Sequence, residues 1–588
     1  MAKGISGSAF DFPVLKRVFA FTFPYKKYFY FSVALTLLLA VLSPLLPWLV
    51  QFTVDGYIMK SDAHGLTNMV LLMIALLLFR GVVQFAHTWY TNLLGQVAVR
   101  DMRSKLFSHI VGFRTAYFDH TPVGTLVTRT VSDMETVADI FSEGLIVIIG
   151  DLLTLVFIVG FMFYVDWRLT LISLSTIPLL IVAANVFKNG IKEAFREVRT
   201  QVAHLNAFVQ EHITGMNIVQ IFNREETEFK KFKDINALHR DAHIKSNWYY
   251  SIFFPVVELL SSASIALLVW WGARGVLHNE VTLGNLIAFI MYINLLFRPI
   301  RELADKFNTL QLGMVSSERI FKLFDTNEFI PNAGTISNIK VKGEISFENV
   351  WFAYKDEDWV LKDLSLQISA GKMTALVGAT GSGKSSIINT IGRHYDFQKG
   401  NIFLDGRSIR DYELSFLRRN IAMVLQDVFL FSDTVFNNIT LNNSSITKEK
   451  VEEAARAVGV DSFIEQLPGK YNYEVGERGA TLSTGQRQLI SFVRAYVYNP
   501  SILVLDEATS SIDTETEIMI REATARLTQN RTSIVIAHRL ATIQRADKII
   551  VLEHGKIAEE GTHFELLRKG GLYKKLYEAQ FAVFETQI

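Results

Sequence analysis

The stretch GATGSGKSS at residues 378–386 has the composition and spacing of a phosphate-binding loop. It fits the pattern G-x-x-x-x-G-K-[ST], and it lies between the apolar stretch MTALV and the amphipathic stretch SSIINTIGRHY, the strand–loop–helix order that the pattern needs. Glycines let the backbone wrap phosphates, Lys384 places a positive charge on them, and the Ser385 hydroxyl can ligate Mg²⁺. The sequence therefore predicts that a nucleoside triphosphate and Mg²⁺ bind here, at Gly378, Thr380, Gly381, Ser382, Gly383, Lys384, Ser385 and Ser386.

Further polar residues follow stretches that we predict to be buried strands. In SILVLDEATSSID, Asp506 suits a direct or water-mediated contact with Mg²⁺, and Glu507 can polarise the attacking water. Gln426 ends IAMVLQ and can reach both Mg²⁺ and a neighbouring domain. A histidine at a strand end is usually incidental, but the position of His538 after TSIVIA favours a contact with the γ-phosphate. Tyr354 offers a face on which a base can stack, although a lone tyrosine is more often a core residue.

A second feature suited to anions is LSTGQRQ at residues 482–488. Small polar residues open what we predict to be a helix, and helix N-termini attract anions because their N–H groups lack partners and the helix dipole is positive there. Ser483, Gly485 and Gln486 are therefore candidates for a phosphate contact. The phosphate loop does not need this second cradle. The N–H groups at the start of the predicted helix therefore need a hydrogen-bond acceptor other than a phosphate held by that loop.

The composition limits the class of protein. The chain has 588 residues, enough for two or three domains, and 50% of them are hydrophobic. The formal net charge of +1 gives no global field that would attract nucleic acid. The absence of cysteine excludes disulfides, thiolate metal sites and thiol redox chemistry. The N-terminal stretch has no apolar segment beside a small-residue cleavage site, so we expect no cleaved signal peptide.

The apolar residues are concentrated in six long runs between Tyr28 and Phe297. Each is close to the roughly 20 residues that span a hydrocarbon core of about 30 Å, so we predict six transmembrane helices rather than buried helices of a soluble protein. The runs are YFSVALTLLLAVLSPLLPWLV, MVLLMIALLLFRGVVQF, LIVIIGDLLTLVFIVGFMFYV, LTLISLSTIPLLIVAANVF, IFFPVVELLSSASIALLVWWGA and LGNLIAFIMYINLLF.

Basic residues in the loops predict the orientation. The two long loops, after the second and fourth spans, are rich in arginine and lysine, whereas the other loops are short and nearly neutral. The positive-inside rule then makes the N-terminus and both long loops cytoplasmic, and an even number of spans returns the C-terminal half to the cytoplasm. We expect spans two to five to continue as helices below the bilayer, and the protein to lie in the plasma (inner) membrane.

After the sixth span the composition changes. Residues 324–343 are polar, contain proline and glycine, and are typical of a linker; predicted strands and helices then alternate. The expected fold is therefore a membrane α-helical domain at residues 1–323, with six transmembrane helices and long cytoplasmic extensions, and an α/β P-loop ATPase domain at residues 344–588.

Together these motifs resemble those of ABC exporter half-transporters, over nearly the whole chain. YEVGERG resembles the X-loop of that family, and Asp513 in SSID its D-loop. YFDHTPVGTLVTRTVSDM resembles the first intracellular coupling segment, with Phe118, Gly124, Arg129 and Asp133 in the expected places, and ITGMNIVQIFNREE resembles the second. The resemblance implies an ATPase that uses ATP and Mg²⁺ to export or flip a hydrophobic or amphipathic substrate (lipid, drug or peptide) by alternating access.

The resemblance also implies a dimer. In the family, the signature helix of one chain binds the γ-phosphate held by the phosphate loop of another, so two half-transporters form two composite sites. The usual signature glycine is Thr484 here, while Ser483 and Gly485 are retained. Altered signatures occur in some heterodimeric exporters, so Thr484 hints at a heterodimer, but the intact Glu507 and His538 favour a homodimer.

Charged residues inside the predicted spans are the clue to the substrate. Each costs about 2.5–3.5 kcal/mol at the bilayer centre unless it is paired or hydrated. Arg80, Arg298 and Glu258 are candidate substrate residues, and guanidinium groups favour an anionic amphiphile such as a phosphorylated lipid. Glu258 and Asp151 weaken this interpretation, since either could neutralise an arginine, and the charges could instead pair with one another.

Two other functions stay open at this point. The same fold could form an ATP-gated channel or regulator, or it could import its substrate. A soluble DNA-repair ATPase with a similar signature is excluded by the six spans. The expected partners are thus a second half-transporter, membrane lipids and an amphipathic substrate, with no nucleic acid.

Overall fold

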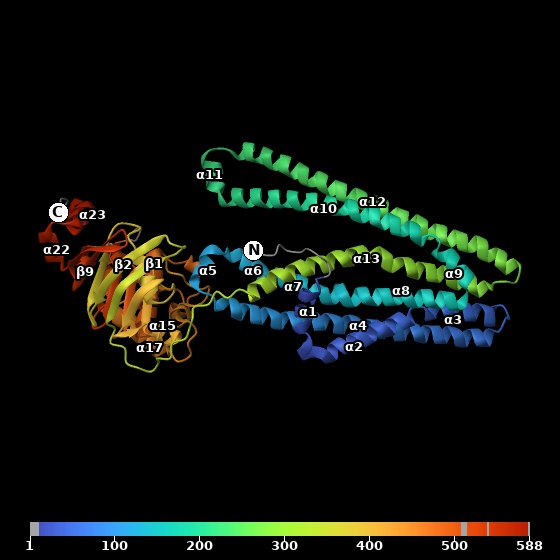
Figure 1. Ribbon diagram of the computed structural model, residues 1–588, viewed down its shortest axis with the longest axis horizontal. Coiled ribbons are helices and arrows are strands. Elements are labelled where there is room, and N and C mark those ends of the chain that lie inside the picture. Colours follow the sequence, from blue (N-terminus) through green and yellow to red (C-terminus); the bar gives the residue numbers. More distant parts are fainter. Residues whose placement is uncertain (1–10, 507–513, 538–539, 586–588) are drawn as a thin grey trace. The chain divides into compact units, whose positions relative to one another are not determined.

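The structure, a computed structural model, describes residues 11–506, 514–537 and 540–585 of the chain. Two compact units separate by their internal contacts (Figure 1). The first contains the described residues up to Val111 together with Val123–Thr326, and the second contains Gly112–Pro122 together with the described residues from Asn327 onward. The short segment 112–122 therefore groups with the second unit by its contacts. The domain boundaries drawn from composition stay a prediction.

The first unit consists of helices, several of them much longer than a bilayer is thick. Its α-helices are α1 (Phe12–Ala20), α2 (Lys26–Leu42), α3 (Leu45–Thr53), α4 (Ala63–Val111), α6 (Val123–Thr130), α7 (Ser132–Asp139), α8 (Leu145–Val165), α9 (Trp167–Leu174), α10 (Ile177–Thr214), α11 (Met216–Ile221), α12 (Glu225–Leu277) and α13 (Leu283–Phe324). Shorter turns of helix are η1 (Phe23–Tyr25), η2 (Val54–Ile58) and η3 (Ile140–Gly144).

Among the described residues, five helical segments are long and apolar enough to cross a membrane. They are Phe23–Ile58, Ala63–Val111, Val123–Val165, Trp167–Thr214 and Glu225–Leu277. The sixth predicted span coincides with the apolar stretch Leu283–Pro299, which is shorter. A helical membrane domain is thus confirmed with five candidate spans, and the sixth span stays a prediction.

Polar side chains begin the helices after the turns. Asp166 ends α8 and begins α9, since its carboxylate accepts hydrogen bonds from the backbone N–H groups of Arg168 and Leu169 at 2.8 and 3.0 Å. Thr282 caps α13 in the same way. Two residues further on, the N–H of Gly284 donates to the Asp55 carboxylate at 2.9 Å. A Cβ on Gly284 would lie 2.5 Å from a backbone oxygen of the neighbouring helix, so only glycine allows this approach.

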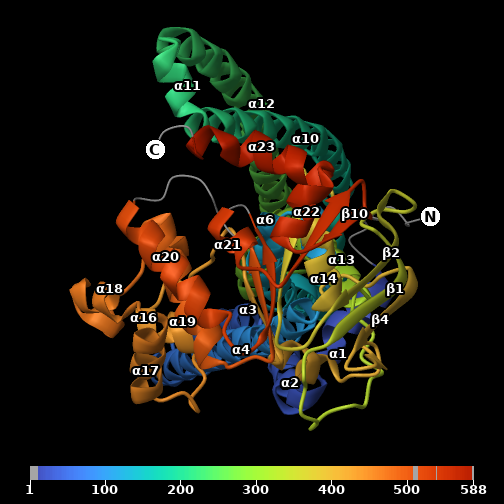
Figure 2. The same cartoon turned by 90° about the vertical axis from the view of Figure 1, so that its left-hand side faces the viewer.

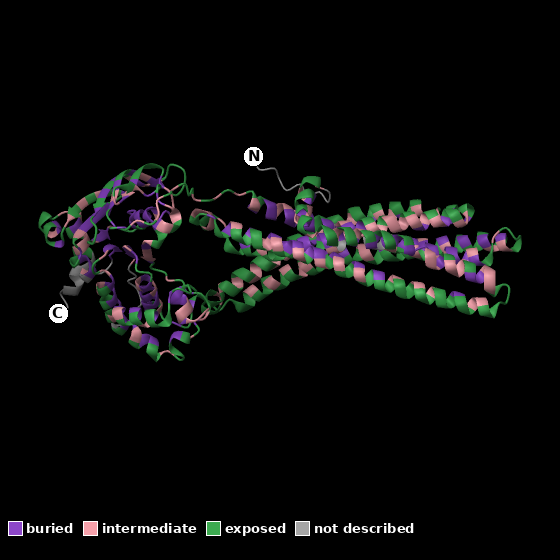
Figure 3. Cartoon of the chain, turned by 90° about the horizontal axis from the view of Figure 1, so that it is seen from below, coloured by how far each residue is buried: buried purple, intermediate pink, exposed green. Residues whose placement is uncertain are grey.

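The long helices α10 and α12 lie side by side and are joined by α11 (Figure 1). Near the centre of the pair, the rings of Phe187 and Phe253 stack with their centroids 4.1 Å apart. Tyr292 of α13 is fully buried and donates its hydroxyl to the carbonyl of Pro44 at 3.0 Å. Figure 3 shows exposed residues along much of the length of these helices, as expected for faces that contact lipid.

The segment that resembles the first coupling segment is held by a buried carboxylate. Asp133 of α7 accepts from the Arg129 guanidinium at 2.5 Å and from the Ser316 hydroxyl of α13 at 3.0 Å. Arg319 of α13 lies 3.8 Å from the same carboxylate. A buried charge is tolerated only when it is paired and hydrogen-bonded, so this cluster fixes α6 and α7 against α13.

The second unit contains two sheets, one four-stranded and one six-stranded. The four-stranded sheet has the order β2-β1-β4-β5, and the six-stranded sheet has the order β10-β9-β3-β8-β7-β6. The strands are β1 (Ile345–Ala353), β2 (Trp359–Ile368), β3 (Met373–Val377), β4 (Lys399–Leu404), β5 (Arg407–Ser408), β6 (Ile421–Val424), β7 (Ile502–Asp506), β8 (Thr532–Ile536), β9 (Lys548–Glu553) and β10 (Lys556–Gly561).

Helices surround the six-stranded sheet. They are α5 (Thr115–His120), α14 (Lys384–Ile391), α15 (Leu414–Arg419), α16 (Val435–Thr440), α17 (Lys448–Val458), α18 (Asp461–Gln466), α19 (Thr484–Val497), α20 (Thr514–Leu527), α21 (Leu540–Gln544), α22 (His563–Lys569) and α23 (Leu572–Glu585), with turns η4 (Lys470–Asn472) and η5 (Glu477–Gly479). Figure 2 shows α16–α20 on one side of the sheet and β1, β2 and β4 on the other.

The central strands are parallel, and this arrangement collects their carboxyl ends at one edge. β9, β3, β8, β7 and β6 all pair in parallel, and only β10 is antiparallel to its neighbour. The phosphate loop follows β3, Gln426 follows β6, and Asp506 ends β7. Ligand sites in such sheets lie at the carboxyl edge, so the fold brings these sequence motifs to one side of the sheet.

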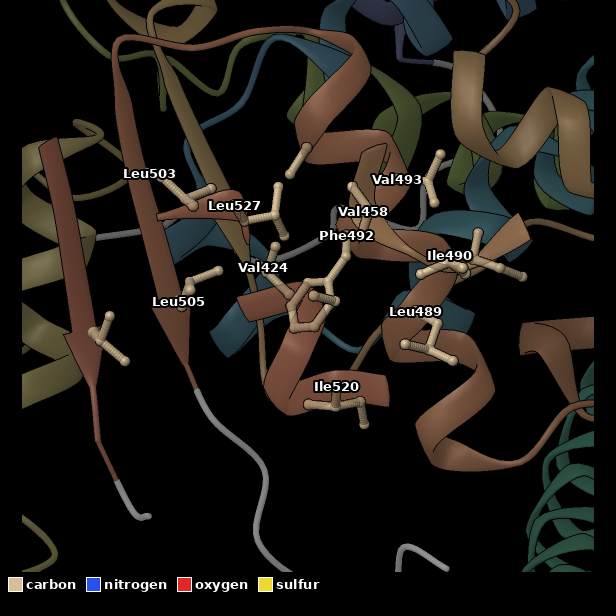
Figure 4. Packing of buried hydrophobic residues seen from close by; sticks show 14 of the residues in the cluster. Val424, Val458, Leu489, Ile490, Phe492, Val493, Leu503, Leu505, Ile520 and Leu527 are labelled. Carbon is tan, nitrogen blue, oxygen red and sulfur yellow. The ribbon is translucent and has the colours of Figure 1, made fainter. Parts of the chain in front are cut away.

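Both faces of the central sheet are buried, which explains why its strands are almost entirely apolar. In β7, Leu503 and Leu505 point into a core formed with α19 and α20, whereas Ile502 and Val504 point into a second core beneath the four-stranded sheet. Figure 4 shows Phe492 of α19 packed in the first core beside Leu505.

Removing Phe492 should destabilise the ATPase unit strongly. The side chain is 2% exposed, and Phe→Ala in a core costs about 3–5 kcal/mol through lost burial and a cavity, which lowers Tm by roughly 10 °C. Thermal unfolding of the purified protein measures the effect. Phe564→Ala is the control, because that ring is 72% exposed. Equal shifts for both variants would contradict the assigned core.

Candidate nucleotide-binding site

The phosphate loop turns sharply between β3 and α14, and two glycines make this turn possible. Gly383, the residue before α14, has a φ of +104°, and a Cβ there would lie 2.8 Å from Leu361 Cδ2. At Gly378, which follows β3, a Cβ would lie 2.4 Å from the carbonyl oxygen of Leu552. A side chain at either position would therefore clash with a neighbouring segment, so only glycine allows the loop to follow this path.

Lys384 carries the charge of this cradle. Its ammonium donates to the carbonyl oxygens of Gly378 and Ala379 at 2.7 and 3.0 Å, so the charge lies inside the loop. Burial lowers the pKa of Lys384, and the negative charge of Asp506 opposes that shift. A cation that is only 9% exposed and bonded to neutral carbonyls attracts a phosphate strongly, because little water screens it.

The hydroxyl groups of the loop fit a phosphate ligand. The Ser382 Oγ is buried and has no hydrogen-bond partner within the described part of the chain. Thr380, Gly381 and Ser385 are exposed at the loop and at the first turn of α14, which has no side-chain cap. Uncapped N–H groups and an unpartnered hydroxyl are the donors that a triphosphate needs.

Tyr354 lies beside the loop, directly after β1. Its hydroxyl is 3.1 Å from the Ser386 Oγ of α14, and Asn389 donates to it at 3.3 Å. The side chain is 42% exposed, so it is not the core residue that a lone tyrosine would usually be. The structure thus brings Tyr354 together with the phosphate loop.

The candidate Mg²⁺ ligands follow the ends of separate strands. Asp506 is half-buried at the end of β7, and Gln426 is exposed two residues after β6. Together with Ser385 they supply the oxygen ligands that Mg²⁺ prefers. Three predicted residues, Glu507, Asp513 and His538, lie outside the described residues.

The signature helix α19 begins with a reciprocal cap. The Gln486 N–H donates to the Ser483 hydroxyl at 3.2 Å, and the Ser483 N–H donates to Gln486 Oε1 at 2.9 Å. Thr484 is exposed, and its hydroxyl accepts from Arg487 at 3.2 Å, whereas Gly485 is buried. In the described part of this chain, no hydrogen bond joins Ser483, Gly485 or Gln486 to residues 378–386.

A cavity in the helical unit contains two of the three substrate candidates. It measures about 660 Å³, and both Arg80 of α4 and Arg298 of α13 line it. Asp151 lines it as well and forms an ion pair with Lys306 at 2.6 Å. Glu258, on α12, is not among the lining residues.

Sequence reasoning missed several residues at these sites. Arg487 and Gln488 lie within a quoted stretch, but nothing marked Arg487 as the partner of Thr484, or Gln488 as a buried residue that lines a small cavity with Asp506. Lys306 lies after the sixth apolar run, where a lysine is unremarkable by composition. Only the helical period of α13, which continues past Pro299, could have placed Lys306 on the face of Arg298.

Comparison with known proteins agrees with this architecture. Residues 29–300 match the ABC transporter transmembrane region, and residues 361–510 match the ABC transporter family of ATPase domains. The ABC transporter ATP-binding protein YknV of Bacillus subtilis is 37% identical, with 97% of this chain and 95% of that protein aligned. The ATP-dependent lipid A-core flippase of Desulfotalea psychrophila is 35% identical, with 96% and 99% aligned. YgaD of Bacillus subtilis, whose name assigns it to multidrug export, is also 35% identical, with 96% and 99% aligned.

A helical membrane domain fused to a nucleotide-binding α/β domain defines a membrane transport ATPase. The chain belongs to the ABC transporter family, as an exporter-type half-transporter that couples ATP hydrolysis to export. The exporter resemblance drawn from the motifs is thereby confirmed.

Replacing Lys384 with alanine should weaken nucleotide binding. A charge-assisted hydrogen bond contributes about 1.5–3 kcal/mol, so the Kd for ATP should rise about 10- to 100-fold. Titration of the purified protein with a fluorescent ATP analogue measures this Kd. Lys372→Ala is the control, because Lys372 directly precedes β3, at the end of the strand away from the loop, and pairs with Asp547 at 3.1 Å. An unchanged Kd in Lys384→Ala would refute the role of this loop.

Proposed function

We propose that this half-transporter exports or flips an amphipathic molecule with an anionic head group, as a dimer that uses ATP and Mg²⁺. The cavity that contains Arg80 and Arg298 carries the proposal. Two relatives are named for a lipid and for multidrug export, which supports an amphipathic substrate.

The charges of the cavity favour an anion. Arg80, Arg298 and Lys306 line it, and Asp151 is the only carboxylate among its described lining residues. Lys306 lies 2.6 Å from Asp151 and already compensates that charge. An anionic head group that reached the two guanidinium groups would form bidentate hydrogen bonds where water is scarce.

The cavity also suits the apolar part of such a molecule. Its volume of about 660 Å³ is within the range of ligand sites, roughly 300–1,000 Å³. Leu39, Leu77, Ile158 and Leu295 line it beside the charged groups. A mixed apolar and cationic lining accommodates an acyl chain together with its head group, whereas a cationic drug would be repelled.

The nucleotide site supplies the energy. In this proposal, Lys384 and the loop N–H groups bind the phosphates, and Mg²⁺ is held by Ser385, Gln426 and Asp506. Glu507 polarises the attacking water, His538 contacts the γ-phosphate, and Tyr354 stacks on the base. These assignments rest on residue type and on the ends of the strands that carry them.

A second chain completes each site. Ser483 and Thr484, at the N-terminus of α19, are exposed. The N–H groups there can donate hydrogen bonds to a phosphate, and in this proposal that phosphate is not bound by the phosphate loop of the same chain. A head-to-tail dimer would place Ser483, Gly485 and Gln486 of one chain, with Asp513, against the nucleotide of the other. We favour a homodimer because this sequence keeps both Glu507 and His538.

The orientation follows from the loop charges. Arginine and lysine are concentrated in the loops after the second and fourth spans, so these loops, the N-terminus and the ATPase unit are cytoplasmic in this proposal. The membrane is then the plasma (inner) membrane, and the ATPase unit lies on the side where ATP is present.

Thr484 tests the homodimer. In a homodimer both composite sites contain this threonine, so Thr484→Gly should preserve or raise the ATPase rate of the protein purified from a single gene. Thr484→Ser is the matched variant, because it removes the methyl group and keeps a hydroxyl for Arg487. A protein inactive in every form alone, yet active with a second half-transporter, would establish a heterodimer.

The arginines test the substrate class. Anionic, neutral and cationic amphiphiles of equal chain length are compared as stimulators of ATPase activity, and as cargo, in vesicles with purified protein. The anionic compound should act best, and Arg80→Ala or Arg298→Ala should raise its half-maximal concentration about 10-fold or more. Arg274→Ala, outside the cavity lining, is the matched control, and Glu507→Gln is the inactive one. Equal stimulation by all three compounds, unchanged by either substitution, would refute the proposal.

A further inference from the structure

The short helix α5 (Thr115–His120) is anchored within the ATPase unit. Phe113, just before it, forms a β-bridge with Phe329, and their ring centroids are 5.5 Å apart. The backbone N–H of Arg114 donates to the carbonyl of Glu328 at 2.7 Å, and its guanidinium lies 2.5 Å from the Glu328 carboxylate. The start of α5 is therefore fixed by backbone and side-chain contacts together.

The other end of α5 also has a polar contact to the body of the unit. The Tyr395 hydroxyl donates to the carboxylate of Asp119. Burial and this hydrogen bond raise the pKa of Tyr395, so the phenol stays protonated and remains a donor at physiological pH. Because Asp119 is exposed, water competes for its carboxylate, so the bond depends on how well Tyr395 is positioned.

Tyr354 is the residue that holds Tyr395. The two rings meet edge to face, with centroids 5.0 Å apart and planes at 83°. Phe352 contacts both rings, at 4.7 Å from Tyr354 and 6.1 Å from Tyr395. Edge-to-face pairs have a preferred geometry, so fixing one ring restricts the other.

The phosphate loop and Tyr395 are also close along the chain. α14 begins at Lys384 and ends at Ile391, four residues before Tyr395. The Tyr354 hydroxyl contacts Ser386 on the same helix at 3.1 Å. A base that stacks on the exposed face of Tyr354 would therefore order Tyr354, then Tyr395, then the Asp119 end of α5.

We propose that Tyr395 is a positioning residue that transmits occupancy of the base site at Tyr354 to α5. The inference rests on the proposed function, because Tyr354 must stack on the base and α5 must belong to the coupling path. Among the hydrogen bonds and ring contacts of the described residues, none joins Tyr395 to residues 378–386.

The first experiment does not require a transported substrate. Amide hydrogen exchange of residues 115–120 is followed in the full-length protein, with Mg²⁺ and either a non-hydrolysable ATP analogue or tripolyphosphate. The analogue should slow exchange about tenfold, whereas tripolyphosphate, which has no base, should have little effect. Tyr395→Phe, which removes only the hydroxyl, should abolish the slowing.

Two further variants make this result specific. Tyr498→Phe is the matched control, because it removes a phenol that donates to the carbonyl of Thr440 at 2.7 Å, on other helices. It should keep the full slowing. Asp119→Asn keeps an acceptor and should retain part of it. Equal slowing in wild type and Tyr395→Phe, or equal slowing by tripolyphosphate, would overturn the proposal.

The second experiment measures coupling. Tyr395→Phe should change the KM for ATP less than twofold, yet lower the amount of substrate exported per ATP about 10-fold. A KM that rises by the same factor would show instead that Tyr395 belongs to the nucleotide pocket, and the proposal would fail. If wild type exports nothing, the proposed function fails, while hydrogen exchange still decides the role of Tyr395.

Discussion

The parallel pairing of β3, β8, β7 and β6 is the constraint on which the nucleotide site depends. Val424 pairs with Leu505, and Leu376 pairs with Ile536, so the residues that follow these strands leave the sheet at the same level. Because both faces of the sheet are buried and apolar, a shift of one residue would move side chains from one core to the other, where their shapes would not fit their new neighbours. The apolar strands therefore fix the place of Asp506, Gln426 and the phosphate loop more firmly than any contact among those polar residues does.

In the helical unit the corresponding constraint is the cost of charge away from water. For Asp133 the cost of burying the charge is offset, since its carboxylate accepts hydrogen bonds from Arg129 and Ser316 and lies near Arg319. In the cavity, Asp151 is paired with Lys306, and Arg80 and Arg298 line the same space. The Asp133 cluster joins helices, so it is a structural network. The charged residues around Asp151 line a cavity, so they form a candidate binding site.

Most of the fold could be predicted from the sequence because each element carries a local signal. The phosphate loop, the apolar strand ends and the long apolar runs have fixed spacing, so the order of the elements and the residues at the sheet edge were accessible. Contacts between segments that are far apart in the sequence could not be predicted in this way. Nothing near Asp119 indicates Tyr395, and no local signal marks residues 112–122 as a segment whose contacts group it with the second unit. Asp151 could have neutralised an arginine by sequence alone, and the ion pair that the structure shows is with Lys306, which lies beyond the apolar run where charge is ordinary.

The cap on α19 explains how a threonine can occupy the signature. The reciprocal bonds between Ser483 and Gln486 satisfy the N–H groups of those two residues within the chain. The N–H groups of Thr484 and Gly485 belong to the first turn, where no helical carbonyl is available to them, so they could donate to a phosphate. The Thr484 hydroxyl already accepts from Arg487, so the side chain that replaces the usual glycine hydrogen is oriented by a contact within the chain. A phosphate from the second chain would therefore meet an intact pair of donors, and the substitution would change how closely it approaches rather than whether it binds.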